Sequence, residues 1–255
     1  MTDPAQRRTH DTTRTACTSP AGGSLPLLLC APSRSRPAAA VLLFHGGGWQ
    51  TGSAEQFAPQ CQALASQGIL AAGAGYRLVG QGAATLCDCL DDARAAIEHV
   101  RGLAPGVPLF VGGGSAGGQL ALAAALTPPT ADEHPYAGLL LFNPVVDLCE
   151  PTGTWQTFRE ILGLDAQTAA ALSPLHLLRP GAPPAIVFHG TADALVPIHS
   201  VRHFRDAMRA AGNACRLVEY EGAPHGFFNP GAGEARWHEE TTALAAAFVL
   251  EPSTR

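Results

Sequence analysis

The stretch Gly113-Gly114-Ser115-Ala116-Gly117 decides how the rest of the chain is interpreted. The apolar run Leu109-Phe110-Val111 precedes it, and residues 119–126, which follow it, have helical character. Residues without a Cβ atom two places before and after the serine let a strand and a helix approach closely, which exposes the hydroxyl at the tip of a sharp turn. The helix directs free backbone N–H groups to the space beside the serine, where they stabilise negative charge on an attacked carbonyl. The pattern predicts a nucleophile elbow, although a glycine-rich turn with only a structural role has the same composition.

The composition excludes several classes of function. The chain has 255 residues, of which 46% are hydrophobic, and this is enough to bury one substantial core. A net charge of −5 without a basic stripe argues against nucleic acid or an anionic membrane as partner. All sixteen basic residues are arginines. This excludes chemistry that needs a lysine, such as Schiff-base formation, a Ser-Lys dyad or a phosphate-binding loop.

The N-terminal residues 1–23 are polar and lack the apolar core of a signal peptide. We expect them to form a loose arm before one domain of residues 24–255, and we expect a cytoplasmic protein. The longest apolar runs, such as residues 139–142, are too short to span a bilayer.

No metal or cofactor is expected from the sequence. The seven cysteines are odd in number and scattered, as is typical of reduced thiols. Cys87 and Cys89 lack nearby partners for a zinc site. His199 and His203 lie four apart on an expected helix, but no acidic or cysteine ligand accompanies them, so a solvated helix face is the preferred interpretation.

Strand-like apolar runs alternate with segments of helical spacing along the chain, which predicts a mostly parallel sheet flanked by helices in one domain. The insertion of residues 148–184 is longer than an ordinary connection and contains two helical stretches, 154–162 and 166–172, so it could form a small lid. Strands are expected at residues 24–30, 38–44, 69–76, 107–111, 137–144, 185–189 and 215–220, and helices at 54–67, 87–101, 119–126, 198–211 and 234–249.

Ligand sites of open parallel sheets collect at the C-terminal ends of the strands. Asp193 and His225 follow the last two expected strands, so serine, acid and base occur in that order, each in a loop after its own strand. An imidazole can take the proton of Ser115, and a carboxylate on the other ring nitrogen fixes the tautomer. Asp147 also follows a strand at this edge and is the alternative acid. A capping aspartate and an ordinary loop histidine are the non-catalytic interpretations of Asp193 and His225.

The segment His45-Gly46-Gly47-Gly48-Trp49 follows another buried strand. Three consecutive glycines suit either a flexible loop or a loop whose backbone N–H groups must approach a bound group closely. His45 and His189 both end buried strands, and we expect them to hydrogen-bond loop backbone rather than to exchange protons.

Four segments together resemble the α/β-hydrolase esterases, in particular the carboxylesterases and acetyl esterases related to hormone-sensitive lipase and to the bacterial acetylxylan/feruloyl esterases. The resemblance covers the chain from residue 38 to its end. The segments are His45-Gly46-Gly47-Gly48-Trp49, Gly113-Gly114-Ser115-Ala116-Gly117-Gly118, His189-Gly190-Thr191-Ala192-Asp193 and Pro224-His225-Gly226-Phe227-Phe228.

The resemblance implies an α/β-hydrolase fold and assigns roles to residues of this chain. Ser115 would be the nucleophile, and Asp193 and His225 would complete the triad. An oxyanion hole would be formed by the backbone amides of Gly47, Gly48 and Ala116. Apart from the resemblance, we expect Trp49 to bind substrate in a shallow pocket beside Ser115. Fewer than fifty residues precede His45, too few for the helical cap of the hormone-sensitive-lipase group.

We therefore expect a serine esterase that acts on short-chain, small-molecule esters through an acyl-enzyme intermediate. One alternative is an amide-bond hydrolase, either an arylformamidase or a prolyl-oligopeptidase-like peptidase. The lack of a gating domain and the alanine at position 116 argue against the peptidase, whereas the arylformamidase stays open. A non-catalytic binding protein is the other alternative, and the complete triad argues against it. The sequence does not predict the oligomeric state.

Overall fold

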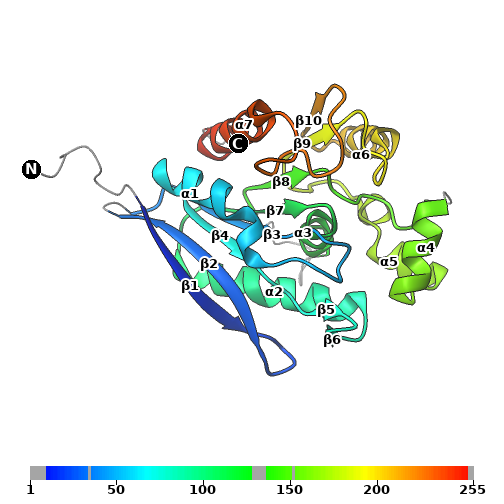
Figure 1. Cartoon of the computed structure of the whole chain (residues 1–255), viewed down its shortest axis with the longest axis horizontal. Coiled ribbons are helices and arrows are strands. Elements are labelled where there is room, and N and C mark those ends of the chain that lie inside the picture. The colour runs from blue at the N-terminus through cyan, green and yellow to red at the C-terminus, as the bar shows by residue number, and fades with distance from the viewer. Residues whose placement is uncertain (1–9, 34–35, 128–135, 151–152, 252–255) are drawn as a thin grey trace, which may run out of the picture.

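An eight-stranded sheet runs through the middle of the molecule in the order β1-β2-β4-β3-β7-β8-β9-β10 (Figure 1). The structure is a computed structural model that describes residues 10–33, 36–127, 136–150 and 153–251, the last range without the side chains of residues 153–155 and 157. The strands are β1 (His10–Thr18), β2 (Ser24–Pro32), β3 (Ala40–Phe44), β4 (Leu70–Ala74), β7 (Leu109–Gly114), β8 (Gly138–Phe142), β9 (Ala185–Gly190) and β10 (Cys215–Tyr220). A separate pair is formed by β5 (Leu78–Val79) and β6 (Gly82–Ala83).

The central strands are buried on both faces. From β4 to β10 all neighbouring strands are parallel. In β3 the side chains of Leu42 and Phe44 belong to one hydrophobic cluster, whereas Val41 and Leu43 belong to a second cluster on the other face. A strand that is apolar at every position requires this two-sided cover, so the fold confirms the predicted parallel sheet with flanking helices.

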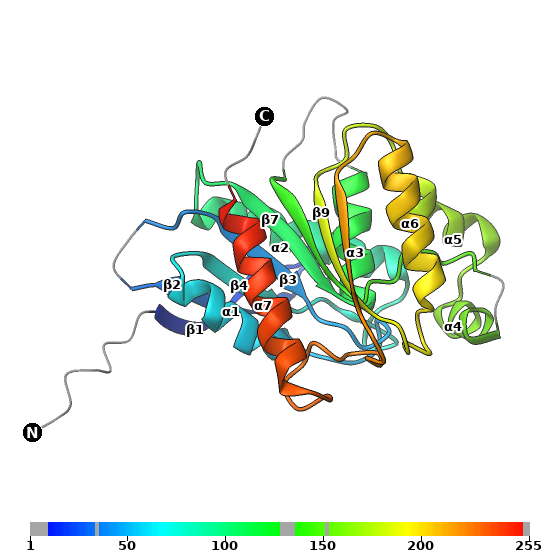
Figure 2. The ribbon, with the colours of Figure 1, turned by 90° about the horizontal axis from the view of Figure 1, so that it is seen from above.

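Helices form one layer on each face of the sheet (Figure 2). Helices α1 and α7 contribute to one hydrophobic cluster, and α2, α3 and α6 contribute to the other. Every residue of α3 is buried, which explains why this helix lacks a polar face. The helices are α1 (Ala58–Ser66), α2 (Leu86–Leu103), α3 (Ala116–Leu126), α4 (Gly153–Leu162), α5 (Ala166–Leu172), α6 (Ile198–Ala210) and α7 (Ala235–Leu250), with short 3-10 turns η1 (Ala54–Phe57) and η2 (Pro174–Leu177).

The first strand lies within the segment that we expected to be a loose arm. β1 pairs antiparallel with β2 from His10 opposite Pro32 to Thr18 opposite Ser24. The expectation was therefore wrong for residues 10–18, while residues 1–9 lie outside the described part of the chain. Most side chains of β1 are exposed, so the alternation of apolar and polar residues that marks a half-buried strand is missing. Its pairing covers an edge of β2 whose backbone groups would otherwise be unpaired.

The insertion of residues 148–184 contains α4, α5 and η2, at one side of the molecule in Figure 1. Both helices expected there are present. Leu162, Ala169 and Leu172 of this segment are buried in the core cluster that also contains α3. The insertion is thus packed against the body of the domain.

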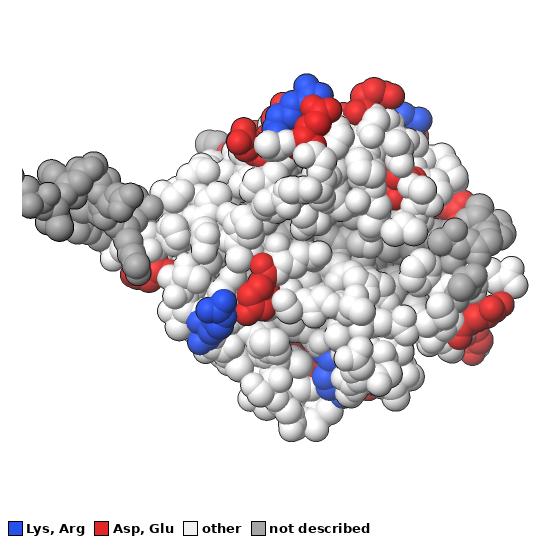
Figure 3. Space-filling model, viewed as in Figure 1, with Lys and Arg blue, Asp and Glu red and all other residues white. Residues whose placement is uncertain are grey.

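Charged side chains are sparse on the face shown in Figure 3, where acidic and basic groups lie close together near its upper edge. Among the described residues, no helix has both the length and the apolar character needed to cross a membrane.

Candidate active site

Ser115 occupies the turn between β7 and α3, at the C-terminal edge of the sheet. Its backbone has φ 50° and ψ −115°, a conformation that non-glycine residues rarely adopt. Three backbone hydrogen bonds hold this conformation. The N–H of Ser115 donates to the Phe142 carbonyl over 3.0 Å, and its carbonyl accepts from the amides of Gln119 and Val145 over 3.1 Å each. The strain at the turn is therefore fixed by β8 and α3.

The flanking glycines are required by the close approach of the turn to β3. A Cβ atom on Gly117 would collide with the carbonyl oxygens of Phe44 and His45, and one on Gly113 would collide with that of Phe44. A side chain at either position would push the turn away from the neighbouring strand. The strand, sharp turn and helix predicted around the serine are thus present.

The structure brings Ser115, His225 and Asp193 into one hydrogen-bonded series. His225 lies in the turn after β10, and Asp193 lies in the loop after β9. The Nε2 atom of His225 is 3.0 Å from Ser115 Oγ, and its Nδ1 atom is 2.7 Å from Asp193 Oδ2. Residues separated by as many as 110 positions in the sequence therefore meet at the place where the sequence analysis expected them.

The surroundings of Asp193 keep its carboxylate charged. Its side chain is fully buried, and Oδ1 accepts hydrogen bonds from the amides of Leu195 and Val196, each over 2.9 Å. Burial acts to raise the pKa of Asp193, but the hydrogen bond and charge of His225 and the Val196 amide outweigh it, so this pKa lies below its ordinary value. The carboxylate then accepts from Nδ1–H of His225, and Nε2 is left to accept the proton of Ser115.

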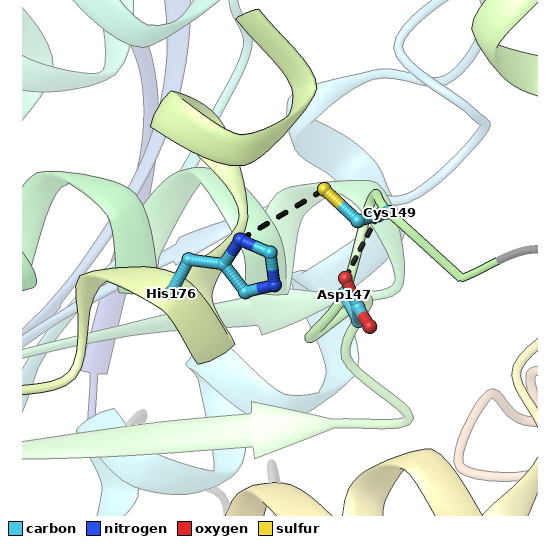
Figure 4. Close-up of side chains that lie close together, drawn as sticks. All are labelled: Asp147, Cys149 and His176. Carbon is cyan, nitrogen blue, oxygen red and sulfur yellow. Dashed lines mark hydrogen bonds between the residues drawn. The ribbon is translucent and has the colours of Figure 1, made fainter. Parts of the chain in front are cut away.

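The alternative acid, Asp147, has other partners. Its Oδ1 atom accepts from the amide of Cys149 over 2.8 Å (Figure 4). The same atom accepts from the hydroxyl of Ser173 over 2.9 Å. These bonds fasten the loop after β8 to the far end of the insertion. Because Asp193 and not Asp147 contacts His225, the geometry favours Asp193 as the acid.

Asp147 belongs to a cluster of three side chains that could bind a metal ion. The sequence alone did not indicate this cluster. Ligand atoms of Asp147, Cys149 and His176 lie within 4.8 Å of one another, and Cys149 Sγ is 3.9 Å from His176 Nδ1 (Figure 4). Zinc accepts such donors. However, Oδ1 of Asp147 already accepts two hydrogen bonds, and burial raises the pKa of the Cys149 thiol, which disfavours the thiolate that a metal needs. These contacts fit a loop anchor better than a metal centre.

The glycine loop after β3 runs beside Ser115. A Cβ atom placed on Gly46 would lie 3.4 Å from Ser115 Cβ. Gly47, Gly48 and Trp49 all have positive φ, at 115°, 59° and 61°, a run that glycine at the first two positions makes possible. Within the described ranges, the amides of Gly47 and Gly48 donate to no protein acceptor. The same holds for Ala116, the first residue of α3. Three N–H groups without a protein acceptor thus lie in the glycine loop and at the residue that follows the serine.

The position of Trp49 differs from the expectation that this residue lies beside the substrate. Its side chain is only 1% exposed, and its indole N–H donates to Oε1 of Gln119 over 3.1 Å. Gln119 in turn donates through Nε2 to the carbonyl of Leu172 over 2.8 Å. A ring with so little accessible surface cannot be a main substrate contact, so Trp49 anchors the glycine loop to α3 and the insertion instead.

Two buried histidines behave as the sequence predicted. Nδ1 of His45 is 2.7 Å from the Gly46 carbonyl, and the ring stacks on Tyr76 at a centroid distance of 4.3 Å. His189 contacts the Val196 carbonyl through Nε2 over 2.8 Å. Burial lowers the pKa of both His45 and His189, so both rings stay neutral and act as donors to loop backbone.

Two further residues lie at the site. Phe158 of α4 lies over the glycine loop, because a Cβ atom on Gly48 would be 3.2 Å from its Cε1 atom. Asn143 is fully buried directly after β8, and its amide contacts both His225 and the amide of Gly226. Asn143 was missed because the expected strand of residues 137–144 included it, whereas β8 ends at Phe142 and leaves Asn143 just past the strand.

Comparisons with known proteins agree with this geometry. Residues 41–229 match the alpha/beta hydrolase fold family. The chain is 31% identical over 196 residues to a probable carboxylic ester hydrolase, LipM of Mycobacterium tuberculosis, covering 67% of this chain and 45% of LipM. It is 30% identical over 243 residues to Lipase 2 of Moraxella sp. (strain TA144), covering 77% of this chain and 56% of the lipase. The chain spans about half the length of these curated relatives.

Among solved structures, a thermophilic esterase of the Planctomycetes species Thermogutta terrifontis, Est2 with propionate bound, is 38% identical and superposes with a TM-score of 0.82. The superposition covers 94% of each chain. The family match runs from β3, past the serine turn, to the residues just after His225. Because it covers most of the chain, this protein belongs to the alpha/beta hydrolase fold family.

Proposed function

We propose that this chain is a serine hydrolase that cleaves carboxylic esters with short acyl chains. The observation that carries the proposal is the hydrogen-bonded series from Asp193 through His225 to Ser115, at 2.7 and 3.0 Å, at a strained turn. A serine hydroxyl is a weak nucleophile until an oriented base can take its proton, and this series supplies that base. Relatives named as a carboxylic ester hydrolase, a lipase and an esterase support the choice of esters.

In the first half of the proposed reaction, Oγ of Ser115 attacks the ester carbonyl carbon while its proton passes to Nε2 of His225. The carbonyl oxygen becomes an oxyanion, and Asp193 stabilises the imidazolium. When the intermediate collapses, the bond between the carbonyl carbon and the alkoxy oxygen breaks. The proton on Nε2 then passes to the leaving oxygen, so an alcohol departs and the acyl group stays on Ser115.

The second half repeats these steps with water as the nucleophile. His225 takes a proton from water, the resulting hydroxide attacks the acyl carbon, and the bond to Ser115 Oγ breaks. The proton on Nε2 returns to Oγ, a carboxylic acid leaves, and the serine is restored. No external oxidant, reductant or metal is needed for this balance.

The oxyanion formed in both halves needs donors, and we assign them to the amides of Gly47, Gly48 and Ala116. All three N–H groups are free within the part of the chain that the structure describes. Ala116 directly follows Ser115, and a Cβ atom on Gly46, next to Gly47, would lie 3.4 Å from Ser115 Cβ. Ala116 adds the partial positive charge at the N-terminus of α3. Loss of one such donor typically lowers turnover by about 10² to 10³.

The preference for short acyl chains is supported by the position of Phe158. Its ring lies over Gly48, so the insertion closes the space beside the proposed oxyanion hole. A buried methylene contributes about 0.8 kcal/mol only where it finds apolar wall, and forcing a longer chain against a rigid wall costs about 1 to 3 kcal/mol. Solved structures of the Thermogutta terrifontis esterase hold propionate and butyrate, both short acids.

A substrate panel tests the proposal. Purified enzyme is assayed against p-nitrophenyl esters of increasing chain length, acetylated sugars and N-formylkynurenine, with Ser115→Ala as the control for background hydrolysis. We expect the highest kcat/KM for a short p-nitrophenyl ester or an acetylated sugar. A higher kcat/KM for N-formylkynurenine would indicate an arylformamidase instead of an esterase. The absence of turnover with every compound would indicate a non-catalytic binding protein.

A further inference from the structure

Asn143 occupies a strained and fully buried position directly after β8. Its φ is 37°, and its backbone N–H donates to the carbonyl of Phe188 on β9 over 2.7 Å. Asparagine tolerates a positive φ better than most residues with a side chain, but the conformation still has an energetic cost. Strain that the neighbouring strands hold in place is often found at functional sites.

The amide of Asn143 contacts the His225 segment at two points. Its Oδ1 atom accepts a hydrogen bond from the backbone N–H of Gly226 over 3.0 Å, and its Nδ2 atom lies 3.4 Å from Nε2 of His225. The Gly226 contact fixes the orientation of the amide, because a backbone N–H must face an oxygen. The NH₂ group of Asn143 therefore faces the nitrogen of His225 that has to receive the serine proton.

The segment held in this way is a tight turn. The N–H of Phe227 is 3.3 Å from the carbonyl of Pro224, and Gly226 has a φ of 78°. These features place His225 at the second position of a turn that needs glycine at the third. Asp193 holds the ring at Nδ1, and Asn143 lies beside Nε2 at the opposite end. The ring is thus bracketed by the loops after β8 and β9.

We propose that Asn143 is a positioning residue for His225 that also favours the neutral form of its ring. The inference rests on the proposed function of Ser115 and His225. An N–H group that faces Nε2 is compatible with the lone pair of a neutral ring, whereas a charged ring would place Nε2–H against it. Asp193 acts in the opposite sense, and the neighbouring His189 has its Nε2 atom 3.5 Å from Asp193 Oδ2.

Two substitutions of Asn143 distinguish its effect on the position of the His225 ring from its effect on the charge of that ring. Asn143→Gly removes the amide and accepts the positive φ without strain. Asn143→Asp keeps an oxygen for Gly226 but replaces the NH₂ group by a second oxygen, which stabilises a charged ring. The matched control is Asn213→Gly. Asn213 is also buried and also bonds backbone through both amide atoms, to Ala182 and Arg179, but it lies at the opposite edge of the sheet, before β10.

The expected result is a loss in kcat rather than in KM. For Asn143→Gly we expect kcat to fall about tenfold to a hundredfold, because the ring loses its alignment with Ser115. The acid limb of kcat/KM should move to higher pH in both variants, and by about one unit or more in Asn143→Asp. Asn213→Gly should lower the melting temperature while leaving the pH profile in place.

A second measurement does not depend on turnover. The downfield proton resonance of the imidazole N–H bonded to Asp193, identified by its loss in His225→Gln, can be followed through a pH titration by NMR in the Ser115→Ala background. The pH at the midpoint of this titration should be lowest in the protein that retains Asn143, higher in Asn143→Gly and highest in Asn143→Asp. Unchanged midpoints and pH profiles, with only a lower melting temperature, would reduce Asn143 to a structural residue. Turnover by Ser115→Ala would overturn the proposed function instead, while the titration would still test Asn143.

Discussion

The indole N–H of Trp49 donates to the side-chain oxygen of Gln119 over 3.1 Å, in a part of the core where both residues are at most 1% exposed. The bond joins the glycine loop to α3, the helix that directly follows Ser115. It therefore sets the distance between two parts of the proposed oxyanion hole, the amides of Gly47 and Gly48 on the loop and that of Ala116 on the helix. Trp49 thus serves the site without being accessible to a substrate.

Trp49→Phe is expected to impair both stability and turnover. The change removes the N–H donor and leaves the buried oxygen of Gln119 unsatisfied, at a cost of about 1 to 3 kcal/mol in the free energy of unfolding. Turnover should fall because the loop amides lose their fixed position, with KM changed less than kcat. Denaturation and steady-state kinetics on a short p-nitrophenyl ester measure both. A raised KM with unchanged kcat would restore Trp49 as a substrate contact.

Ser115→Ala is expected to abolish ester hydrolysis and leave the fold intact. The hydroxyl makes its hydrogen bond to His225 at a half-buried turn, and the backbone bonds that hold the turn do not involve it. Turnover below about a thousandth of the wild-type value, with a nearly unchanged melting temperature, is the expected outcome. Ser66→Ala, on the surface of α1, is the matched control. Substantial residual activity would remove Ser115 from the mechanism.

The two candidate acids can be separated by the same substitution. Asp193→Asn should lower kcat by roughly three to four orders of magnitude, because His225 loses the carboxylate that fixes its tautomer. Asp147→Asn keeps an oxygen for Cys149 and Ser173, so turnover should change far less. Both are measured on one ester at saturating concentration. The opposite order of effects would transfer the role of acid to Asp147.

Phe158→Ala should widen the range of acyl chains. The wild-type enzyme is expected to have its highest kcat/KM at two to four carbons, without activation at an oil-water interface. Removing the ring over Gly48 opens space, so the optimum should move to longer chains, where each methylene that finds new wall contributes about 0.8 kcal/mol. The p-nitrophenyl series from C2 to C12 measures this for both enzymes. A wild-type maximum at C8 or beyond would indicate an extended groove.

The lowered pKa of Asp193 predicts how stability depends on pH. A carboxyl whose pKa is lower in the folded state stabilises the fold fully above its ordinary value of 3.8, and this contribution is lost as the pH falls through the folded-state value. The difference in unfolding free energy between wild type and Asp193→Asn should therefore shrink as the pH is lowered below about 4. Urea denaturation from pH 3 to pH 7 measures it. A constant difference would mean that Asp193 is not the group that titrates.

Features that depend on short stretches of sequence could be predicted. Continuous apolar runs identified the buried strands, and the residues just past them included Ser115, Asp193 and His225. The partners of Asn143 and Trp49 could not be predicted in this way, because these contacts depend on side-chain packing and no strand end or motif marks the residues that make them. The order of elements favours Asp193 over Asp147, because only one helix and one strand separate Asp193 from His225, although both acids follow strands at the same edge. Their distances to His225 depend on how the loops fold back.

The way the insertion of residues 148–184 is anchored suggests that it can be exchanged for another segment to change which substrates are accepted. Its two ends meet, because the amide of Leu148 donates to Ser173 Oγ over 3.1 Å and the amide of Leu175 donates to the Val146 carbonyl over 2.8 Å. Chain between joined ends can change in length at small entropic cost, since the cost of loop closure grows only slowly with length. Residues 150–172 can therefore change in length, or be replaced by design, while the sheet and the serine turn keep their geometry, provided that the buried contacts of Leu162, Ala169 and Leu172 are retained. Under the proposed function, the serine turn that performs the reaction and the insertion that limits which esters can bind thus lie in separate parts of the fold.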